Sequence, residues 1–276
     1  MREPELCSGC VLNPSSLVTT GLRLSLCPKE SSSVIRSLIE RYARGKSIRR
    51  RLPQRFGKRS VYLSPDSALS YLKRNWADGS SDLLAAARKY VSNQSNVWDI
   101  GGTVGVFTFA SAHEAGPDAE IVSVEADPFL ASLLQRSACH GDNRDRNVAV
   151  VCAAVSDRTG IARFMIANRG RSSNSLEQSG HRTQAGGTRY VQHVPTLTLD
   201  SMLKTFKAPQ IMKIDVEGAE AMVLEGGTRV LTESRPIIYV EVGRDQNESV
   251  ASILKTKDYR LFNGDVSDGV EIQKCA

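Results

Sequence analysis

Apolar residues recur at two different spacings along the chain, and the change comes near residue 96. Before that point, three segments carry apolar residues at helical spacing behind the serine or proline residues typical of helix starts. They are residues 31–45, 64–76 and 80–91. Residues 1–30 show no clear period and are expected to form a loose arm. We therefore predict a basic, mostly helical N-terminal extension over residues 1–80.

Beyond residue 96, short apolar runs alternate with helical stretches. The runs predict strands at residues 97–100, 121–125, 147–155, 160–167, 190–199, 210–215, 235–242 and 259–263. The stretches between them predict helices at residues 104–114, 127–140, 200–206, 217–226 and 248–256. This alternation indicates a largely parallel sheet with helices on both faces. Right-handed crossovers make it a doubly wound, Rossmann-like α/β domain, which we place at residues 81–276.

Composition and charge narrow the class of protein. The chain is 41% hydrophobic and 24% charged, as in globular proteins, and no apolar run reaches the ~20 residues of a membrane helix. The N-terminus lacks the apolar core of a secretory signal, so we expect a cytoplasmic protein without an integral membrane segment. Residues 1–95 carry 17 Lys and Arg against 7 Asp and Glu, whereas residues 96–276 carry 19 and 23. The basic excess therefore lies in the N-terminal third.

The six cysteines do not predict a metal site. Cys7 and Cys10 have CxxC spacing, but neither a second such pair nor a pair of histidines follows at zinc-ligand spacing. We expect reduced thiols and no bound metal.

A polar site is predicted at one edge of the sheet. Asp99, Glu125 and Asp215 each end a predicted strand, and Asp99 precedes the glycines of "DIGGTVG". Ligands of doubly wound sheets bind at the carboxyl ends of the strands. These acids are therefore expected to face a common ligand.

The loop favours a ligand with positive groups. Gly101, Gly102 and Gly105 do not have the G-x-G-x-x-G spacing of a dinucleotide loop, and no Walker A motif is present. A carboxylate at Asp99 would repel a pyrophosphate but suit the ammonium of S-adenosylmethionine (SAM), while the amides of the next helix could take the SAM carboxylate. Glu125 would accept hydrogen bonds from the ribose hydroxyls. NAD sites share that last role, so an NAD-linked enzyme stays as a weaker alternative.

The chain resembles the FkbM-type family of SAM-dependent methyltransferases. The segments that carry this resemblance are "VWDIGGTVGVFTF", "VSVEADP", "AAVSDRTGIARF", "TLTLDSML", "MKIDVEGAEAMVLEGG" and "RPIIYVEV", over about residues 82–263. The resemblance implies a class I methyltransferase fold with SAM as donor, and usually O-methylation of a sugar, glycolipid or specialised metabolite. The family usually has Ala-Asn after the first glycine, where this chain has Gly102 and Thr103.

We predict a cofactor site and a reaction centre on this basis. The predicted cofactor contacts are Asp99, Gly101, Gly102, Thr103, Gly105, Glu125, Ala126 and Asp157. The predicted catalytic residues are Asp215, Glu217 and Lys213, because "KIDVEG" ends a core strand and a lysine near a carboxylate lowers its pKa. Glu217 could instead cap the following helix, and a Mg²⁺ ion held by these acids is a further alternative. On the acceptor side we place Ser173, Asn174, Ser175, His193 and Glu241.

Residues 168–189 form a polar stretch of 22 residues, long for a loop inside a compact domain. It could be a binding loop or lid, in which Arg169, Arg171, Arg182 and Arg189 would suit an anionic acceptor. It could equally be a solvated loop.

Two other functions compete with O-methylation of a small molecule or glycan. The basic run around Arg49–Arg51 would suit a nucleic-acid methyltransferase, but "KIDVEG" replaces the Asn-Pro-Pro-aromatic motif of enzymes that methylate base amines, and no RNA-binding signature is present. A non-catalytic SAM-binding module would bind SAM without turnover. A homo-oligomer is compatible with the sequence.

Overall fold

A seven-stranded sheet forms the centre of the molecule. The computed structural model describes residues 10–13, 41–179 and 186–263. The strand order is β13-β1-β12-β11-β4-β5-β6. The strands are β1 (Cys10–Asn13), β4 (Val97–Ile100), β5 (Glu120–Glu125), β6 (Asn147–Cys152), β11 (Ile211–Ile214), β12 (Ile237–Val240) and β13 (Arg260–Asn263). Parallel pairing joins five of these strands, in the order β12, β11, β4, β5 and β6. Strand β1 runs antiparallel to both β12 and β13.

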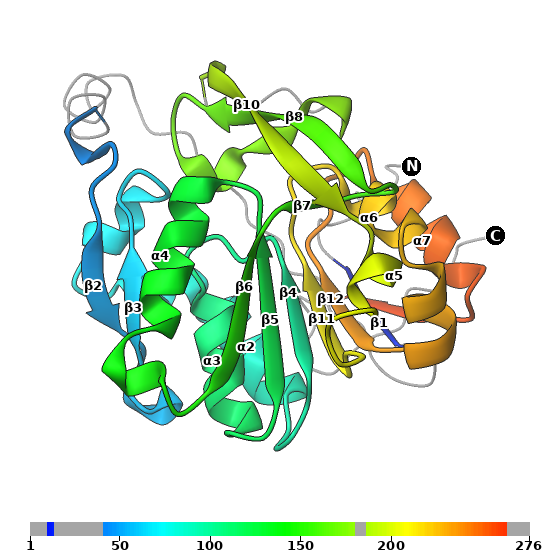
Figure 1. Ribbon diagram of the computed structural model, residues 1–276, viewed down its shortest axis with the longest axis horizontal. Helices are drawn as coiled ribbons and strands as arrows, with labels where there is room; N and C mark the ends of the chain where they lie inside the picture. The colour runs from blue at the N-terminus through cyan, green and yellow to red at the C-terminus, as the bar shows by residue number, and fades with distance from the viewer. Residues whose placement is uncertain (1–9, 14–40, 180–185, 264–276) are drawn as a thin grey trace, which may run out of the picture.

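Helices lie on both sides of this sheet, as Figure 1 shows, with α2 to α4 grouped on one side and α5 to α7 on the other. They are α2 (Ser81–Tyr90), α3 (Val106–Ala115), α4 (Pro128–Ala138), α5 (Leu199–Met202), α6 (Glu220–Glu225) and α7 (Asn247–Lys255), with a π-helical turn η8 (Val230–Ser234). Every residue of β4 and β11 is buried, which explains why both strands are apolar apart from Asp99 and Lys213. The predicted doubly wound α/β fold is confirmed.

A smaller second sheet lies above the carboxyl edge of the first (Figure 1). Its order is β7-β10-β8-β9. The strands are β7 (Ala154–Val155), β8 (Gly160–Ala167), β9 (Ser175–Leu176) and β10 (Thr188–Leu197). We call β8 to β10, with the 3₁₀ turns η6 (Arg171–Ser173) and η7 (Glu177–Ser179), the cap. The stretch predicted as one strand at 147–155 is thus divided between two sheets, and much of the polar stretch 168–189 is ordered.

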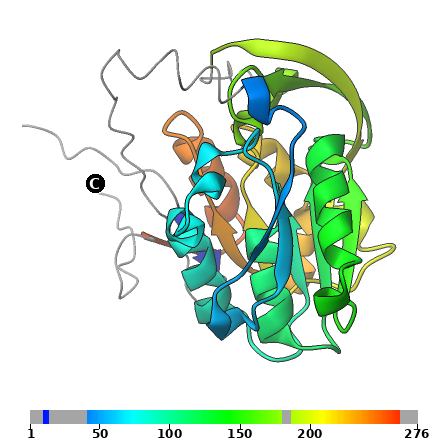
Figure 2. The same cartoon turned by 90° about the vertical axis from the view of Figure 1, so that its left-hand side faces the viewer.

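The described part of the N-terminal extension, residues 10–13 and 41–80, is not mostly helical, and the predicted helical extension is not confirmed. It contains a hairpin of β2 (Ile48–Arg51) and β3 (Ser60–Leu63), and the 3₁₀ turns η2 (Gln54–Phe56), η3 (Leu69–Leu72), η4 (Trp76–Ser80). The helix predicted over 31–45 and the loose arm lie largely outside the described residues, although β1 falls within that arm. Figure 2 shows the hairpin alongside α4, where the amide of Tyr62 donates to Ser137 Oγ at 2.8 Å.

Tertiary contacts explain why residues 64–76 do not form the predicted helix. The Ser64 hydroxyl donates to the carbonyl of Lys46 at 2.7 Å and also accepts the amide of Asp66. This local turn positions the Asp66 carboxylate inside the protein, 4% exposed, against distant arginines. Serine and aspartate side chains that bond in this way favour turns over helix interiors.

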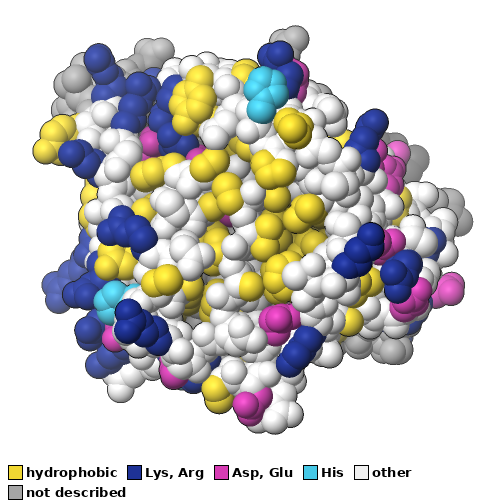
Figure 3. All heavy atoms as spheres, viewed as in Figure 1, with side chains coloured by type: hydrophobic (Ala, Val, Ile, Leu, Met, Phe, Trp, Pro, Cys, Tyr) yellow, Lys and Arg dark blue, Asp and Glu magenta, His cyan; other side chains and the backbone are white. Residues whose placement is uncertain are grey.

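The hairpin carries six of the 17 Lys and Arg residues of the N-terminal third and no Asp or Glu. Arg49 and Arg51 alternate with less exposed neighbours along β2, so their side chains leave the same face. Figure 3 shows lysine and arginine side chains gathered over β2 and β3 on the left of the molecule. The described helices are all too short or too polar to span a bilayer.

We predict that the loop after β4 tolerates no side chain at Gly101. Gly101 has φ +79°, and a Cβ there would overlap the carbonyl oxygen of Asp215; Gly45 has φ +66° with open space around it. Both Gly→Ala variants carry the left-handed penalty of about 1 kcal/mol, and Gly101→Ala adds overpacking of about 1–3 kcal/mol. Urea denaturation should show the larger loss for Gly101→Ala, and equal losses in the two variants would contradict the packing role.

Candidate active site

Two pockets adjoin at the carboxyl edge of the main sheet. The first, which we call the apolar pocket, lies under the cap and encloses about 520 Å³ including its open mouth. Its apolar lining includes Ile100, Val124, Leu130, Val155, Phe164 and Leu176. The second, the acidic pocket, lies between β11, β12 and residues 68–83. Thr103, Ser172, Asp215 and Glu217 line both, so the two pockets share a wall.

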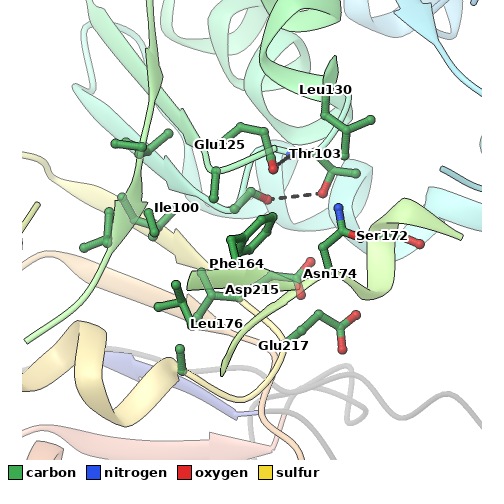
Figure 4. Close-up of a pocket in the computed structure, with 18 of the residues that line it drawn as sticks. Ile100, Thr103, Glu125, Leu130, Phe164, Ser172, Asn174, Leu176, Asp215 and Glu217 are labelled. Atoms are coloured by element: carbon green, nitrogen blue, oxygen red, sulfur yellow. Dashed lines mark hydrogen bonds between the residues drawn. The ribbon is translucent and has the colours of Figure 1, made fainter. Parts of the chain in front are cut away.

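Glu125 forms one end of the apolar pocket (Figure 4). Its side chain is 6% exposed, and its two oxygens accept the backbone amides of Thr103 and Asp127, each at 2.8 Å. Burial is the main reason that the pKa of Glu125 is raised, to about 8. Each carboxylate oxygen can accept a second hydrogen bond, so Glu125 can also bind a diol. Ala126 lines the same pocket.

The glycines of the loop pack against protein. A Cβ at Gly102 would overlap the Ser123 hydroxyl, and one at Gly105 would come within 2.6 Å of Leu134. Gly101 lines the apolar pocket and Gly102 the acidic pocket, whereas Gly105 lines neither and precedes α3 as its N-cap. Thr103 has φ +51°, the left-handed region that favours glycine or asparagine, which turns its amide toward Glu125.

A buried ion cluster lies beneath the loop. Lys213 is 2% exposed, and its Nζ lies 3.3 Å from a carboxylate oxygen of Asp99 and 3.3 Å from one of Asp215. The same ammonium donates to the carbonyl of Gly101 at 2.6 Å. Although burial opposes its charge, the two carboxylates hold the pKa of Lys213 above its usual value. Lys213 is therefore a fixed cation, held between Asp99 and Asp215.

Asp99 does not line either pocket, contrary to its predicted contact with the ligand. It is fully buried, and the Thr108 hydroxyl donates to it at 2.5 Å while Lys213 neutralises it. The reason is register, because Asp99 lies directly opposite Lys213 on the neighbouring strand and α3 covers that face.

Glu217 occupies the shared wall in a strained conformation, with φ +53°. It does not cap α6, because the N-cap there is Ala219 and no side chain bonds the helix amides. Solvent reaches Glu217, yet the density of protein around its carboxylate, followed by nearby negative charges, raises its pKa to about 8. Those charges belong to Asp215, Glu241 and Glu220.

Figure 4 shows how the labelled groups are arranged, with Glu125 and Thr103 at one end of the pocket and Asp215 and Glu217 at the other. Phe164 lies between them. The apolar pocket thus connects the buried carboxylate of Glu125 to the carboxylates of Asp215 and Glu217.

An internal ion network fixes the cap over this pocket. Arg171, 8% exposed, donates to Asp66 at 2.8 Å, Asp127 at 2.5 Å and the hydroxyl of Tyr190 at 3.1 Å. Arg189 donates to Asp66 as well, at 2.7 Å. Sequence reasoning missed Asp66 and Asp127, because their partners lie 105 and 44 residues away along the chain. Arg171 and Arg189 bind these internal acids, which differs from the predicted contact with an anionic acceptor.

Of the other residues predicted to bind the cofactor or the acceptor, some line a pocket and the others do not. Asn174 lines the apolar pocket and donates to Asp127 at 2.9 Å, and Glu241 lines the acidic pocket. Neither pocket is lined by Ser173, Ser175, Asp157 or His193. His193 is exposed on β10 because its neighbour Val194 takes the inward face of the strand. Asp157 pairs with Arg158 at the surface.

Sequence reasoning also missed Ser172, Tyr239 and Glu220. Ser172 lies beside the predicted Ser173, and Tyr239 is hidden in the apolar run of β12.

Among the described residues, no three His, Cys, Asp or Glu side chains form a group that could hold a metal ion. The Mg²⁺ alternative gains no support from these side chains.

We predict that the cap network contributes strongly to stability. Replacing Arg171 by Met leaves Asp127 buried without its cation and Asp66 with Arg189 alone, which costs about 3–5 kcal/mol of unfolding free energy. The matched variant Arg158→Met breaks a pair whose arginine is 74% exposed and should cost less than about 1 kcal/mol. Chemical denaturation of both variants measures the difference, and a small loss for Arg171→Met would refute it.

The chain is similar to a known protein family and to solved structures. Residues 99–261 match the methyltransferase FkbM domain family. The crystal structure of methyltransferase FkbM from Methylobacillus flagellatus is similar over 59% of this chain and 38% of that chain, with 16% identity and a TM-score of 0.43. Aeropyrum pernix fibrillarin, solved with natively bound SAM, matches 78% of this chain and 76% of its own, with 12% identity and a TM-score of 0.40.

No curated protein sequence matches the chain. The match to the methyltransferase FkbM domain nevertheless extends over more than half of the residues. The chain therefore belongs to the FkbM family of methyltransferases.

Proposed function

We propose that this protein transfers a methyl group from SAM to a hydroxyl of a sugar, glycolipid or specialised metabolite. The observation that carries the proposal is the shared wall of the two pockets, where Asp215 and Glu217 lie between a nucleoside-sized slot and an acidic chamber. A donor in one pocket and an acceptor in the other would meet end to end at this wall, as an in-line transfer requires, which supports the proposal.

The apolar pocket has the chemistry that a SAM nucleoside needs. Leu130, Phe164 and Leu176 supply apolar walls for a flat base, and Glu125 supplies the acceptors for ribose hydroxyls. The loop after β4 leads into α3, whose first residues Val106 and Phe107 line the acidic pocket, so the amides of this first turn can hold the amino-acid portion. When bound there, SAM supplies an activated methyl group on a sulfonium centre.

Glu217 is the proposed general base. Its raised pKa keeps it basic enough to accept the proton of an acceptor hydroxyl, and its position on the shared wall puts it beside the site of transfer. Asp215 orients the acceptor, while Lys213 holds Asp215 and the loop in fixed positions. Lys213 is thus a positioning residue.

The proposed function is tested by incubating the protein with SAM and a panel of sugars, glycolipids and small hydroxyl compounds. The readout is S-adenosylhomocysteine (SAH) together with the methylated product. SAM binding without turnover on any acceptor would favour the non-catalytic binding module. Product formed only on RNA or DNA would favour the nucleic-acid alternative.

We predict that Glu125→Gln weakens SAM binding about 10- to 100-fold, because the NH2 group of glutamine cannot accept a hydrogen bond and leaves a buried donor unpaired, at a cost of about 1–3 kcal/mol. Glu120→Gln is the matched control, since Glu120 begins the same strand at the opposite edge of the sheet. Isothermal titration calorimetry with SAM measures both variants. Unchanged affinity in Glu125→Gln, or equal weakening in both, would contradict the assignment.

We also predict that methyl transfer rises with pH through the pKa of Glu217. A general base acts when deprotonated, and the pKa of Glu217 is raised to about 8, so kcat/KM should climb with pH and level off above about 8. Glu217→Gln should lower the rate about 10²–10⁴-fold and abolish this dependence. Glu225→Gln, an exposed neighbour on α6, should behave as wild type. A pH profile that persists in Glu217→Gln would assign the base elsewhere.

A further inference from the structure

We propose that the β2–β3 hairpin binds the protein to an anionic lipid surface, with two exposed apolar side chains beside it entering the headgroup layer. The inference goes beyond the proposed function, and the binding does not depend on that function. It is carried by cations that pair with no described carboxylate and by the apolar side chains next to them.

The segment that contains the hairpin is strongly cationic. Residues 41–63 include nine Lys and Arg and no Asp or Glu. Two of the nine are used inside the protein, because Arg59 pairs with Asp145 and Arg50 donates to the carbonyl of Leu72 at 3.2 Å. The other seven are exposed, and none of them forms an ion pair with a residue that the structure describes. Their charge is therefore available to a partner.

These cations gather on one side of the molecule. Arg49 and Arg51 leave the same face of β2. Arg136 of α4 joins them, because its guanidinium lies 4.2 Å from the ring centre of Tyr62, the residue opposite Arg49 on β3. Figure 2 shows this side, with the hairpin between α4 and the turns η3 and η4. We call it the basic face.

The acids next to the basic face do not cancel its charge. The carboxylates of Asp142 and Asp145 border the hairpin, where Asp142 accepts the Ser60 hydroxyl at 2.6 Å. Asp145 is already shared between Arg59 and Arg146. The exposed cations of the face outnumber these two acids, so the face attracts a partner with several negative charges.

Two exposed apolar side chains lie beside the cations. Tyr42 is 80% exposed, and the Lys46 ammonium lies 5.7 Å from the centre of its ring. Leu72 is 47% exposed and is followed by the exposed residues Lys73 and Arg74. Exposed apolar groups among Lys and Arg are typical of surfaces that enter the interfacial layer of a membrane.

A lipid surface suits this face better than a nucleic acid does. Phosphates of either partner attract the cations, but a nucleic-acid backbone offers no apolar layer for Leu72. Single strands also bind by stacking their bases on exposed aromatic rings. The aromatic rings of the hairpin are already occupied, because Phe56 is buried and Tyr62 is covered by Arg136. An anionic bilayer uses both the cations and the apolar side chains.

Binding through this face would bring the acidic pocket to the membrane. Ser70 and Tyr71, which come just before Leu72, line that pocket. A glycolipid could then enter the pocket while its lipid chains stay in the bilayer. This consequence, unlike the binding itself, rests on the proposed function.

The experiment measures binding of the full chain to vesicles by sedimentation. One set of vesicles contains phosphatidylcholine alone, and the other also contains about 30% phosphatidylglycerol. We expect the protein to bind the anionic vesicles at least about 20-fold more tightly than the neutral ones. Added salt should reduce this preference.

A triple variant tests the position of the charge. Arg51→Gln, Arg55→Gln and Lys58→Gln together should lower the affinity for anionic vesicles about 100-fold, since each Lys or Arg near such a surface contributes roughly fivefold. All three side chains are exposed, and unchanged thermal unfolding checks that the fold is kept.

The matched control removes the same net charge elsewhere. It combines Lys204→Gln, Lys207→Gln and Lys255→Gln, all at exposed positions of the α5 to α7 side. This control should change the affinity less than about threefold.

A single variant tests the apolar contribution. Leu72→Ser should weaken binding to anionic vesicles at least about threefold and leave the salt dependence unchanged. Ile161→Ser is the matched control, because Ile161 is an exposed apolar residue of the cap, and it should bind as the wild type does.

The inference is overturned if the two kinds of vesicle bind equally, or if the hairpin variant and its control lose the same affinity. Single-stranded RNA is the competing probe. If RNA binds more tightly than anionic vesicles at the same salt concentration and Leu72→Ser binds vesicles as the wild type does, the face recognises nucleic acid and the inference is also overturned. No arm uses SAM or an acceptor, so the proposed function fails or holds separately.

Discussion

The ammonium of Lys213 is the contact on which the active-site edge depends. It is buried between the carboxylates of Asp99 and Asp215, and it also holds the carbonyl of Gly101. Two chain segments far apart in sequence, residues 99–101 and 213–215, thus meet at one nitrogen atom. A buried ammonium is tolerated only when it is paired and hydrogen-bonded, and here the two strand ends and the loop provide those partners.

The extension before α2 belongs to the same arrangement. Asp66 lies inside the protein and binds two arginines of the cap, while Ser70 and Tyr71 line the acidic pocket. The cap in turn covers the slot that ends at Glu125. Residues predicted to form a separate extension therefore line the acidic pocket and hold the cap over the apolar pocket, while the basic face of the hairpin lies at the surface.

The parts of the fold that could be predicted from the sequence are those with strong local signals. Strands buried on both faces leave short apolar runs, which located β4, β5, β11 and β12, and the acids after these runs located the ligand edge. The environment of the Asp99 side chain could not be predicted in this way. It depends on the residue opposite Asp99 on the neighbouring strand β11, which is Lys213. The same limit applies to Asp66 and Arg171, whose pairing joins segments 105 residues apart and overrides local helix propensity.

The close packing of the loop glycines has a consequence for the energetics of ligand binding. Gly101 and Gly102 let the backbone rest against Asp215 and Ser123, and Thr103 is anchored to Glu125 through its amide. The loop is therefore ordered by the folded protein itself, and little conformational entropy remains to be lost when a ligand arrives. A preorganised loop of this kind converts more of its contact energy into affinity.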